Sequence, residues 1–216
     1  MSPHCYHRVA PLLIVGASLW GCSFLAPQRD VSRFYTLAPV VEAPSDADSA
    51  PRGLIYGLGP IELPQYLDRD ELALRVSPAE VTYSESDRWA EPLRTNLTRV
   101  LLQDLSTLLG ADRIVLYPWP RSVPVNYQVA INVLNFERMA TGEALLHARW
   151  FIRDSRTGTF LTLEESRFTH SAASPATADG VNALSADVGD LSRDIAAALL
   201  RLPVPPPSGH PVQKGR

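Results

Sequence analysis

The side chains best suited to chemistry are few and widely spaced. Cys5 and Cys22 both lie within the first 22 residues, and no cysteine follows them. A zinc site requires about four clustered cysteine or histidine ligands. His147 and His170 are the only histidines of the central chain, and neither has further ligands at a suitable spacing. The sequence therefore predicts no metal site and no cofactor.

The patterns typical of hydrolases and dinucleotide-binding enzymes are also missing. No Gly-x-Ser-x-Gly segment, which would expose a nucleophilic serine, occurs in the chain. Glu164 and Glu165 adjoin each other on an expected strand, without a further carboxylate in an evident pocket. Gly57-Leu58-Gly59 lacks the third glycine and the following helix of a phosphate-binding turn. We therefore expect no catalytic residues.

The length and the net charge of the chain limit which other classes of protein it can belong to. The 216 residues are 45% hydrophobic and 20% charged, which suits one folded domain. The formal net charge is -3 at pH 7. Proteins that bind nucleic acids usually carry a basic face, so we expect no nucleic-acid partner.

The N-terminus has the features of an export signal that ends at a cysteine. Residues 9–20 are apolar apart from Ser18, and this run is too short to span a bilayer comfortably. The segment Leu19-Trp20-Gly21-Cys22 resembles a bacterial lipobox. The resemblance implies that residues 1–21 are a lipoprotein signal peptide and that Cys22 is the lipid-attachment residue. Two or more acyl chains hold a protein stably at a membrane, whereas one chain does so only marginally.

The residues after Cys22 bear on which membrane holds the protein. Ser23 stands where enterobacterial-type sorting uses aspartate to retain a lipoprotein in the inner membrane. We therefore predict anchoring in the outer membrane, facing the periplasm, with the inner membrane as the alternative. Residues 22–32 form an acylated tether that spans at most about 36 Å. Residues 33–202, the single predicted domain, must then stay close to that membrane.

Hydrophobic patterning predicts the elements of this domain. The best helix starts with a cap at Ser86 or Asp87, includes Trp89 and ends at Gly110. A second amphipathic helix covers residues 181–199. We expect a flexible loop over residues 39–51 and a Pro-rich disordered tail over residues 203–216. Strands are expected at residues 33–37, 54–63, 72–76, 80–83, 114–117, 127–133, 144–153 and 159–168.

Two of these expected strands carry further detail. Prolines at positions 60 and 64 favour an edge or a bulge for the strand over residues 54–63. In residues 127–133 apolar and other side chains alternate, so one face should be buried. With the last two strands this segment predicts an antiparallel meander. The predicted fold class is a two-layer α/β sandwich, in α+β arrangement, with a mixed, mostly antiparallel sheet and both helices on one face.

Four segments follow the lipobox in a recognisable order. They are Arg33-Phe34-Tyr35-Thr36-Leu37, the run from Gly59 to Arg69, the run from Arg88 to Leu93, and Tyr117-Pro118-Trp119. Together these segments resemble the PqiC family, the auxiliary lipoproteins of MCE-type transport systems. Each segment alone is a weak signal, and their shared order makes the resemblance specific.

This resemblance implies a function without catalysis. Family members look like ABC-type transport auxiliary components, anchored in a membrane and facing the periplasm. Their expected partner is an MCE protein of the PqiB type, which forms a conduit for lipids between the two membranes. A contribution to membrane integrity and association with further copies of the chain are expected alongside.

Five side chains are candidates for docking this partner. Trp89, Glu91, Pro92 and Leu93 cluster where the first helix is expected to open, and the alternative is a cluster that packs and caps this helix. Trp119 lies between two prolines, and rigid aromatic loops bind at low entropic cost. For Trp119 the alternatives are docking, lipid contact or packing at a strand end.

Another class of protein fits the same anchor and domain. An outer-membrane assembly or secretion accessory lipoprotein would differ in its partner, which would be a β-barrel or a secretin. A periplasmic hydrolase would require the catalytic groups that the sequence lacks.

Overall fold

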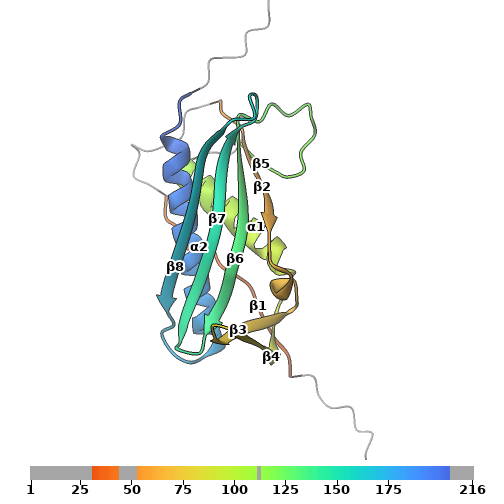
Figure 1. Ribbon diagram of the computed structural model, residues 1–216, viewed down its shortest axis with the longest axis vertical. Helices are drawn as coiled ribbons and strands as arrows, with labels where there is room; N and C mark the ends of the chain where they lie inside the picture. The colour runs from red at the N-terminus through yellow and green to blue at the C-terminus, as the bar shows by residue number, and fades with distance from the viewer. Residues whose placement is uncertain (1–30, 44–52, 111–112, 205–216) are drawn as a thin grey trace, which may run out of the picture. The chain divides into compact units, whose positions relative to one another are not determined.

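The computed structural model describes residues 31–43, 53–110 and 113–204, drawn as coloured ribbon in Figure 1. Cys22 and the predicted signal peptide lie outside these residues, and so do residues 205–216 of the predicted tail. No helix within the described ranges is long and apolar enough to cross a membrane.

The described chain forms one sheet and two α-helices. The helices are α1, Leu93–Leu109, and α2, Thr177–Leu200, and a 3-10 turn covers Gln65–Leu67. The strands are β1 Arg33–Tyr35, β2 Tyr56–Glu62, β3 Glu71–Ser77, β4 Glu80–Trp89, β5 Ile114–Leu116, β6 Tyr127–Met139, β7 Glu143–Asp154 and β8 Phe160–Ser171.

Strand β6 organises the sheet. Along one edge it pairs with β7 from Tyr127 to Arg138, and β8 extends the sheet beyond β7. Along its other edge β6 pairs with β2 near its start and with β3 near its end, parallel in both cases. β5 flanks β2, while β4 and then β1 lie beyond β3. The long β6–β7–β8 pairings are antiparallel, which confirms the predicted meander within a mixed sheet.

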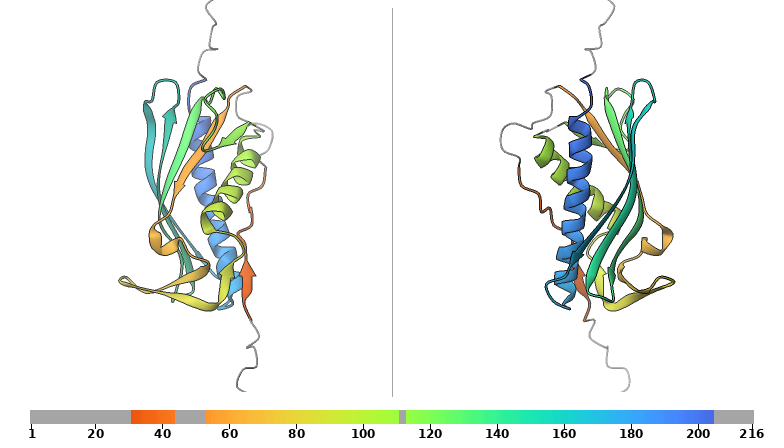
Figure 2. Two further views of the ribbon diagram at one scale, coloured as in Figure 1. Left: turned by 90° about the vertical axis from the view of Figure 1, so that its right-hand side faces the viewer. Right: turned by 60° about the vertical axis from the view of Figure 1, so that its left-hand side comes forward.

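Both helices cover the same face of the sheet, as Figure 2 shows. Their buried apolar residues recur every three or four positions, which is the period of a helix with one apolar face. Each fully buried aliphatic side chain contributes about 1.5–3 kcal/mol to folding. The buried apolar residues are Leu93, Leu97, Val100, Leu101, Leu105 and Leu109 of α1, and Val181, Leu184, Val188, Leu191, Ile195 and Leu199 of α2. Because both helices pack on one face of a single sheet, the predicted two-layer class is confirmed.

The predicted start of the first helix was wrong. Ser86, Asp87 and Trp89 belong to β4, and α1 begins only at Leu93, after Pro92 in an extended conformation. A proline disfavours helical geometry at the residue before it. In addition β1 pairs with the end of β4, with Tyr35 opposite Trp89, so a strand from distant sequence holds this segment extended. Gly110 ends the helix in a left-handed conformation, as predicted.

The strand pattern around β6 also differs from the prediction. Gln128 and Ala130 face away from the helices, yet they are only 5% and 3% exposed. Other side chains therefore cover the start of β6 on both faces of the sheet. The register of β2 against β6 shifts between Leu58 and Ile61, which confirms the predicted bulge. β2 is nevertheless flanked by β5 and β6 and is not an edge strand.

The residues that lead from β1 into the predicted 39–51 loop are held against the helices. The backbone N–H of Leu37 donates to Asn96 Oδ1 of α1 at 3.2 Å, and that of Ala38 donates to Ser185 Oγ of α2 at 3.2 Å. Val40 packs over Gly189, where an added Cβ would come within 2.6 Å of a Val40 methyl carbon. We call residues 37–41 the strap, because they contact both helices on the side away from the sheet.

A buried carboxylate joins α2 to the end of β8. Asp187 is fully buried, and its Oδ1 lies 2.7 Å from His170 Nδ1. Its Oδ2 has no hydrogen-bond partner among the described residues. Burial raises the pKa of the Asp187 carboxyl to about 6, although the hydrogen bond to His170 acts in the opposite direction. The ionised form is therefore poorly solvated in the folded protein.

We predict that Asp187→Asn stabilises the protein at neutral pH. Between about pH 4 and pH 6 the folded chain holds a proton that the unfolded chain has lost, so the free energy of unfolding falls as pH rises across this window. The asparagine removes this penalty, with a gain of up to roughly 3 kcal/mol at pH 7 that disappears near pH 4. Urea unfolding across this range measures both effects. With Asp68→Asn as the exposed control, a destabilised Asp187→Asn variant at pH 7 would contradict the prediction.

Candidate docking surfaces

Trp89 and Leu93 belong to the core. They are 6% and 3% exposed, and the Trp89 ring stacks on Phe136 of β6 with 6.3 Å between the ring centroids. The packing interpretation therefore describes these two residues, because a partner cannot reach them in the folded state. Glu91 and Pro92, which lie between them in sequence, do reach the surface.

Strand β1 adds an exposed ring beside Glu91 and Pro92. Phe34 lies opposite Arg88 of β4 and is 63% exposed. Glu91 accepts a hydrogen bond from Arg99 of α1 at 3.0 Å. We call Phe34, Arg88, Glu91 and Pro92 the β1–β4 corner. An apolar ring bordered by partly exposed charges is a common composition for a protein-binding surface.

Asp87 fixes this corner to the rest of the domain. Its carboxylate accepts hydrogen bonds from Arg33 Nε at 2.8 Å and from Thr177 Oγ1 of α2 at 2.7 Å. Its backbone N–H donates to Ser84 Oγ at 3.0 Å. Burial opposes ionisation, but the hydrogen bonds from Thr177 and Arg33 outweigh it, so the pKa of Asp87 is lowered. The corner is thereby joined to α2 by an ionised group.

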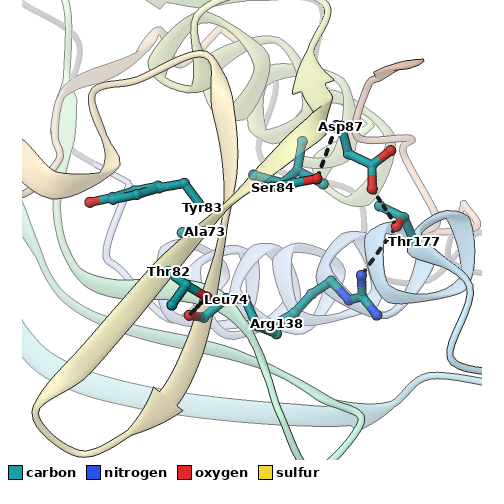
Figure 3. A pocket seen from close by; sticks show the side chains of 9 residues that line it. Ala73, Leu74, Thr82, Tyr83, Ser84, Asp87, Arg138 and Thr177 are labelled. Atoms are coloured by element: carbon teal, nitrogen blue, oxygen red, sulfur yellow. Dashed lines mark hydrogen bonds between the residues drawn. The ribbon is translucent and has the colours of Figure 1, made fainter. Parts of the chain in front are cut away.

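A small pocket adjoins Asp87, with a volume of about 190 Å³. Figure 3 shows it between the β3–β4 hairpin, β6 and the start of α2. Arg138 reaches Thr177 Oγ1 at 3.4 Å and the Pro175 carbonyl at 3.2 Å. The charged groups of the pocket are thus already bound to neighbouring protein atoms. Its lining residues are Leu72, Ala73, Leu74, Thr82, Tyr83, Ser84, Asp87, Arg138 and Thr177.

The segment from Gly59 to Arg69 crosses from β2 toward β3: it belongs to β2 up to Glu62 and then passes through the 3-10 turn at Gln65–Leu67. Tyr66 Oη donates to Glu137 Oε2 at 2.7 Å, and Arg75 Nε donates to Glu137 Oε1. Glu137 is 1% exposed, so this ion pair is buried beneath the crossing segment. Burial, followed by the hydrogen bond to Glu137, raises the pKa of Tyr66 to about 12. Tyr66 therefore stays a neutral donor that holds the segment in place.

Trp119 packs onto the open face at the opposite end of α1 from Trp89. A Cβ added to Gly57 would lie 2.5 Å from Trp119 Cη2, so the indole occupies the space above a residue without a side chain. The Cβ of Tyr117 lies over Gly59, where an added Cβ would come within 2.9 Å of it, and the Tyr117 ring meets Trp119 edge to face at 5.6 Å between ring centroids. Trp119 is half-buried, whereas Tyr117 is 54% exposed. The two rings therefore combine packing with an accessible aromatic surface.

The two central histidines each face carboxylates. His147 Nε2 lies 2.7 Å from Glu165 Oε1, and Glu165 also accepts from Arg149 Nε at 2.6 Å. His147 is half-buried on β7. Within the part of the chain that the structure describes, no three metal-ligating side chains come together.

Two exposed aromatic rings, those of Phe34 and Phe160, were not predicted from the sequence. Phe34 points outward because Tyr35 and Leu37 face the core, a two-residue alternation that the sequence does contain. Phe160 and Leu163 of β8 are 62% and 74% exposed. Their outward position depends on β8 being the last strand of the sheet, and no local pattern reveals that order.

The geometry defines the class of protein: an α+β sandwich that carries exposed aromatic side chains at both ends. Residues 35–196 match the family of ABC-type transport auxiliary lipoprotein components. Because this match spans most of the chain, the protein belongs to that family. The resemblance to PqiC-type lipoproteins is confirmed.

The comparisons include one curated relative in two organisms and several solved structures. The intermembrane transport lipoprotein PqiC of Escherichia coli K12 is 21% identical over 142 residues, which cover 65% of this chain and 72% of the relative. PqiC of Shigella flexneri matches equally. Protein XCC0632 from Xanthomonas campestris has a TM-score of 0.65 at 16% identity, covering 78% of this chain and 95% of that one. A structure described as an uncharacterized protein has a TM-score of 0.63 at 16% identity, over 77% and 97%. These two structures share the fold.

We predict that Gly57→Ala destabilises the protein through the Trp119 ring. The new methyl group would overlap the indole, and overpacking of this kind costs about 1–3 kcal/mol. Trp119→Ala removes the obstacle, so the same glycine substitution should cost little in that background. Chemical unfolding of the wild type, both single variants and the double variant measures this coupling. Equal costs of Gly57→Ala in both backgrounds would show that the ring does not occupy this space.

Proposed function

We propose that this protein is a lipid-anchored, non-enzymatic component of an MCE-type intermembrane lipid transport system. The observation that carries the proposal is the family match over residues 35–196, together with the similarity to PqiC, an intermembrane transport lipoprotein. In this proposal Cys22 holds the chain in the outer membrane, and the folded domain faces the periplasm and docks the MCE protein. An accessory role in outer-membrane assembly or secretion is the alternative that partner identification would reveal.

In this proposal, acyl chains on Cys22 attach the protein to the membrane, and the folded domain itself is not required for attachment. Each buried methylene of an acyl chain contributes about 0.8 kcal/mol to membrane binding. Several chains on Cys22 would therefore hold the protein without any membrane-spanning element. The domain starts only 11 residues later, at Arg33, so the tether restricts it to the region next to the membrane.

We predict that Cys22→Ala releases a folded domain. After a high-salt wash, which screens ionic contacts of the domain with lipid, the variant should move from the membrane fraction to the soluble periplasmic fraction. Its melting temperature should not change, because the substitution lies outside the domain core. Density-gradient separation of the wild-type membranes tests the outer-membrane assignment directly. A folded Cys22→Ala variant that stays entirely in the membrane fraction would refute the anchor.

The β1–β4 corner is the surface that we assign to the MCE partner. Phe34, Arg88 and Pro92 come from two of the segments that carry the family resemblance, and β1 pairing brings those segments together. Arg69, at the end of a third segment, shares the Glu71 carboxylate with Arg88 at 3.4 and 3.3 Å. Residues distant in sequence thus form one surface with an exposed ring at its centre.

We predict that Phe34→Ala weakens recovery of the MCE protein from gently solubilised membranes by roughly tenfold, the loss typical of a central interface aromatic. The fold should tolerate this change because Phe34 is largely exposed. Val76→Ala, at a side chain that is 44% exposed on β3, is the matched control. Undiminished recovery with Phe34→Ala would remove the corner from the interface. A β-barrel or secretin in place of the MCE protein would replace the proposed function.

A further inference from the structure

The open face of the sheet carries a second apolar surface, where β6 begins. Tyr117 and Trp119 lie over β2, while Phe151 of β7 meets Phe160 of β8 edge to face at 5.0 Å between ring centroids. Leu163 pairs with Phe151 across the same strands. We call Tyr117, Trp119, Phe151, Phe160 and Leu163 the aromatic surface.

Strand register shows that these side chains share one face. Gly57 lies opposite Gln128, Gln128 opposite Arg153, and Arg153 opposite Phe160, in a row across four neighbouring strands. Paired residues in adjacent strands point to the same side of a sheet. Trp119, above Gly57, and Phe160 therefore lie at the two ends of this row. Three members of the surface, Tyr117, Phe160 and Leu163, are more than half exposed.

An arginine occupies the middle of the row. Arg153 donates through Nη2 to Gln128 Oε1, and Gln128 donates through Nε2 to the Gly59 carbonyl at 2.8 Å. The buried Nε of Arg153 has no hydrogen-bond partner among the described residues. Arg153 as a whole is only half-buried, and a guanidinium charge between aromatic rings attracts an anionic group, since Arg binds phosphate and carboxylate strongly.

The charges in the segments around the start of β6 are mostly positive. Arg113, Arg121 and Arg156 are exposed on segments next to this end of β6. Asp154 is the only acidic residue within 113–126 and 153–160, and its Oδ1 already accepts the backbone N–H groups of Arg156 and Thr157 at 2.8 and 3.1 Å. With Arg153 these segments hold four arginines and one carboxylate, although the whole chain has a net charge of -3.

From this combination we infer that the aromatic surface binds an anionic phospholipid bilayer. Amphipathic rings favour the headgroup level of a membrane, where Tyr and Trp are enriched. Each Arg or Lys near an anionic bilayer adds about 1 kcal/mol of attraction, which corresponds to about fivefold in affinity. The rings would enter the interface while Arg153 and the three exposed arginines meet lipid phosphates.

This contact is independent of the proposed MCE docking. β6 runs roughly 40 Å from its first to its last residue at the usual rise of a strand. The aromatic surface lies at the start of β6, and the β1–β4 corner lies beside β3, which pairs with the end of β6. One end of the domain can therefore contact lipid while the other end binds a protein.

The test uses the mature chain from residue 22 with Cys22→Ala, so that no acyl chain contributes. Co-sedimentation is measured with vesicles of phosphatidylcholine alone and of phosphatidylcholine mixed with phosphatidylglycerol. We expect binding to the mixed vesicles only, and weaker binding as salt concentration rises. Glycerol phosphate added in solution should not compete, because the rings need a bilayer.

Substitutions then locate the contact. Arg156→Gln and Phe160→Ala should each lower the affinity for mixed vesicles by about fivefold, while Arg167→Gln and Val76→Ala, exposed residues elsewhere, should leave it unchanged. Arg153→Gln should act like Arg156→Gln, and its thermal unfolding shows whether loss of the Gln128 bond disturbs the fold.

Three results would overturn the inference. They are failure of the folded chain to bind mixed vesicles, equal binding to neutral vesicles, and unchanged binding by both Arg156→Gln and Phe160→Ala. In the first case an acidic protein surface would be the occupant to test next. None of these results depends on whether an MCE protein is the partner, because the vesicles contain no protein.

Discussion

The structure depends on one strand that changes partners along its length. β6 is paired with β7 from end to end, but on its other edge β2 accompanies its beginning and β3 its end. Between these two pairings, none of the described strands lies beside the backbone edge of β6. The crossing segment with Tyr66 lies there, and Tyr66, Asn135 and Arg75 all bind the buried Glu137. A buried carboxylate without these partners would cost several kcal/mol, so the change of partners requires this polar cluster.

The same change of partners gives the domain two different ends. Where β2 accompanies β6, Gly57 leaves room for the indole of Trp119, and Gly59 leaves room for the Cβ of Tyr117. Where β3 accompanies β6, the β3–β4 hairpin carries β1 and the turn into α1. One end is therefore aromatic and basic, and the other is rich in ion pairs. This assembly of the sheet keeps the proposed lipid contact and the proposed protein contact at different ends of the domain.

The sequence predicted those elements whose signal is local. α2, β7 and β8 carry long regular patterns, and the structure has them nearly where the patterns placed them. The start of α1 was wrong because Trp89 and Leu93 have helical spacing, while the pairing that decides their conformation comes from β1, 54 positions before the paired residues. The burial of Gln128 and Ala130 could not be predicted either. The residues that cover them approach from the 117–119 loop and from β7, and no periodicity within β6 records such contacts.

The parallel pairing of β1 with β4 also determines how the domain resists pulling. Force applied through the residues before Arg33 acts along the axis of β1, so the hydrogen bonds to β4 are loaded in shear and must break together. If they yield, the next contacts in line are those of the strap, where Leu37 and Ala38 are bound to Asn96 and Ser185 on two different helices. An antiparallel hairpin pulled from one end would instead open one bond at a time. The pairing of β1 with β4, followed by the strap, therefore gives the N-terminal connection two successive points of mechanical resistance.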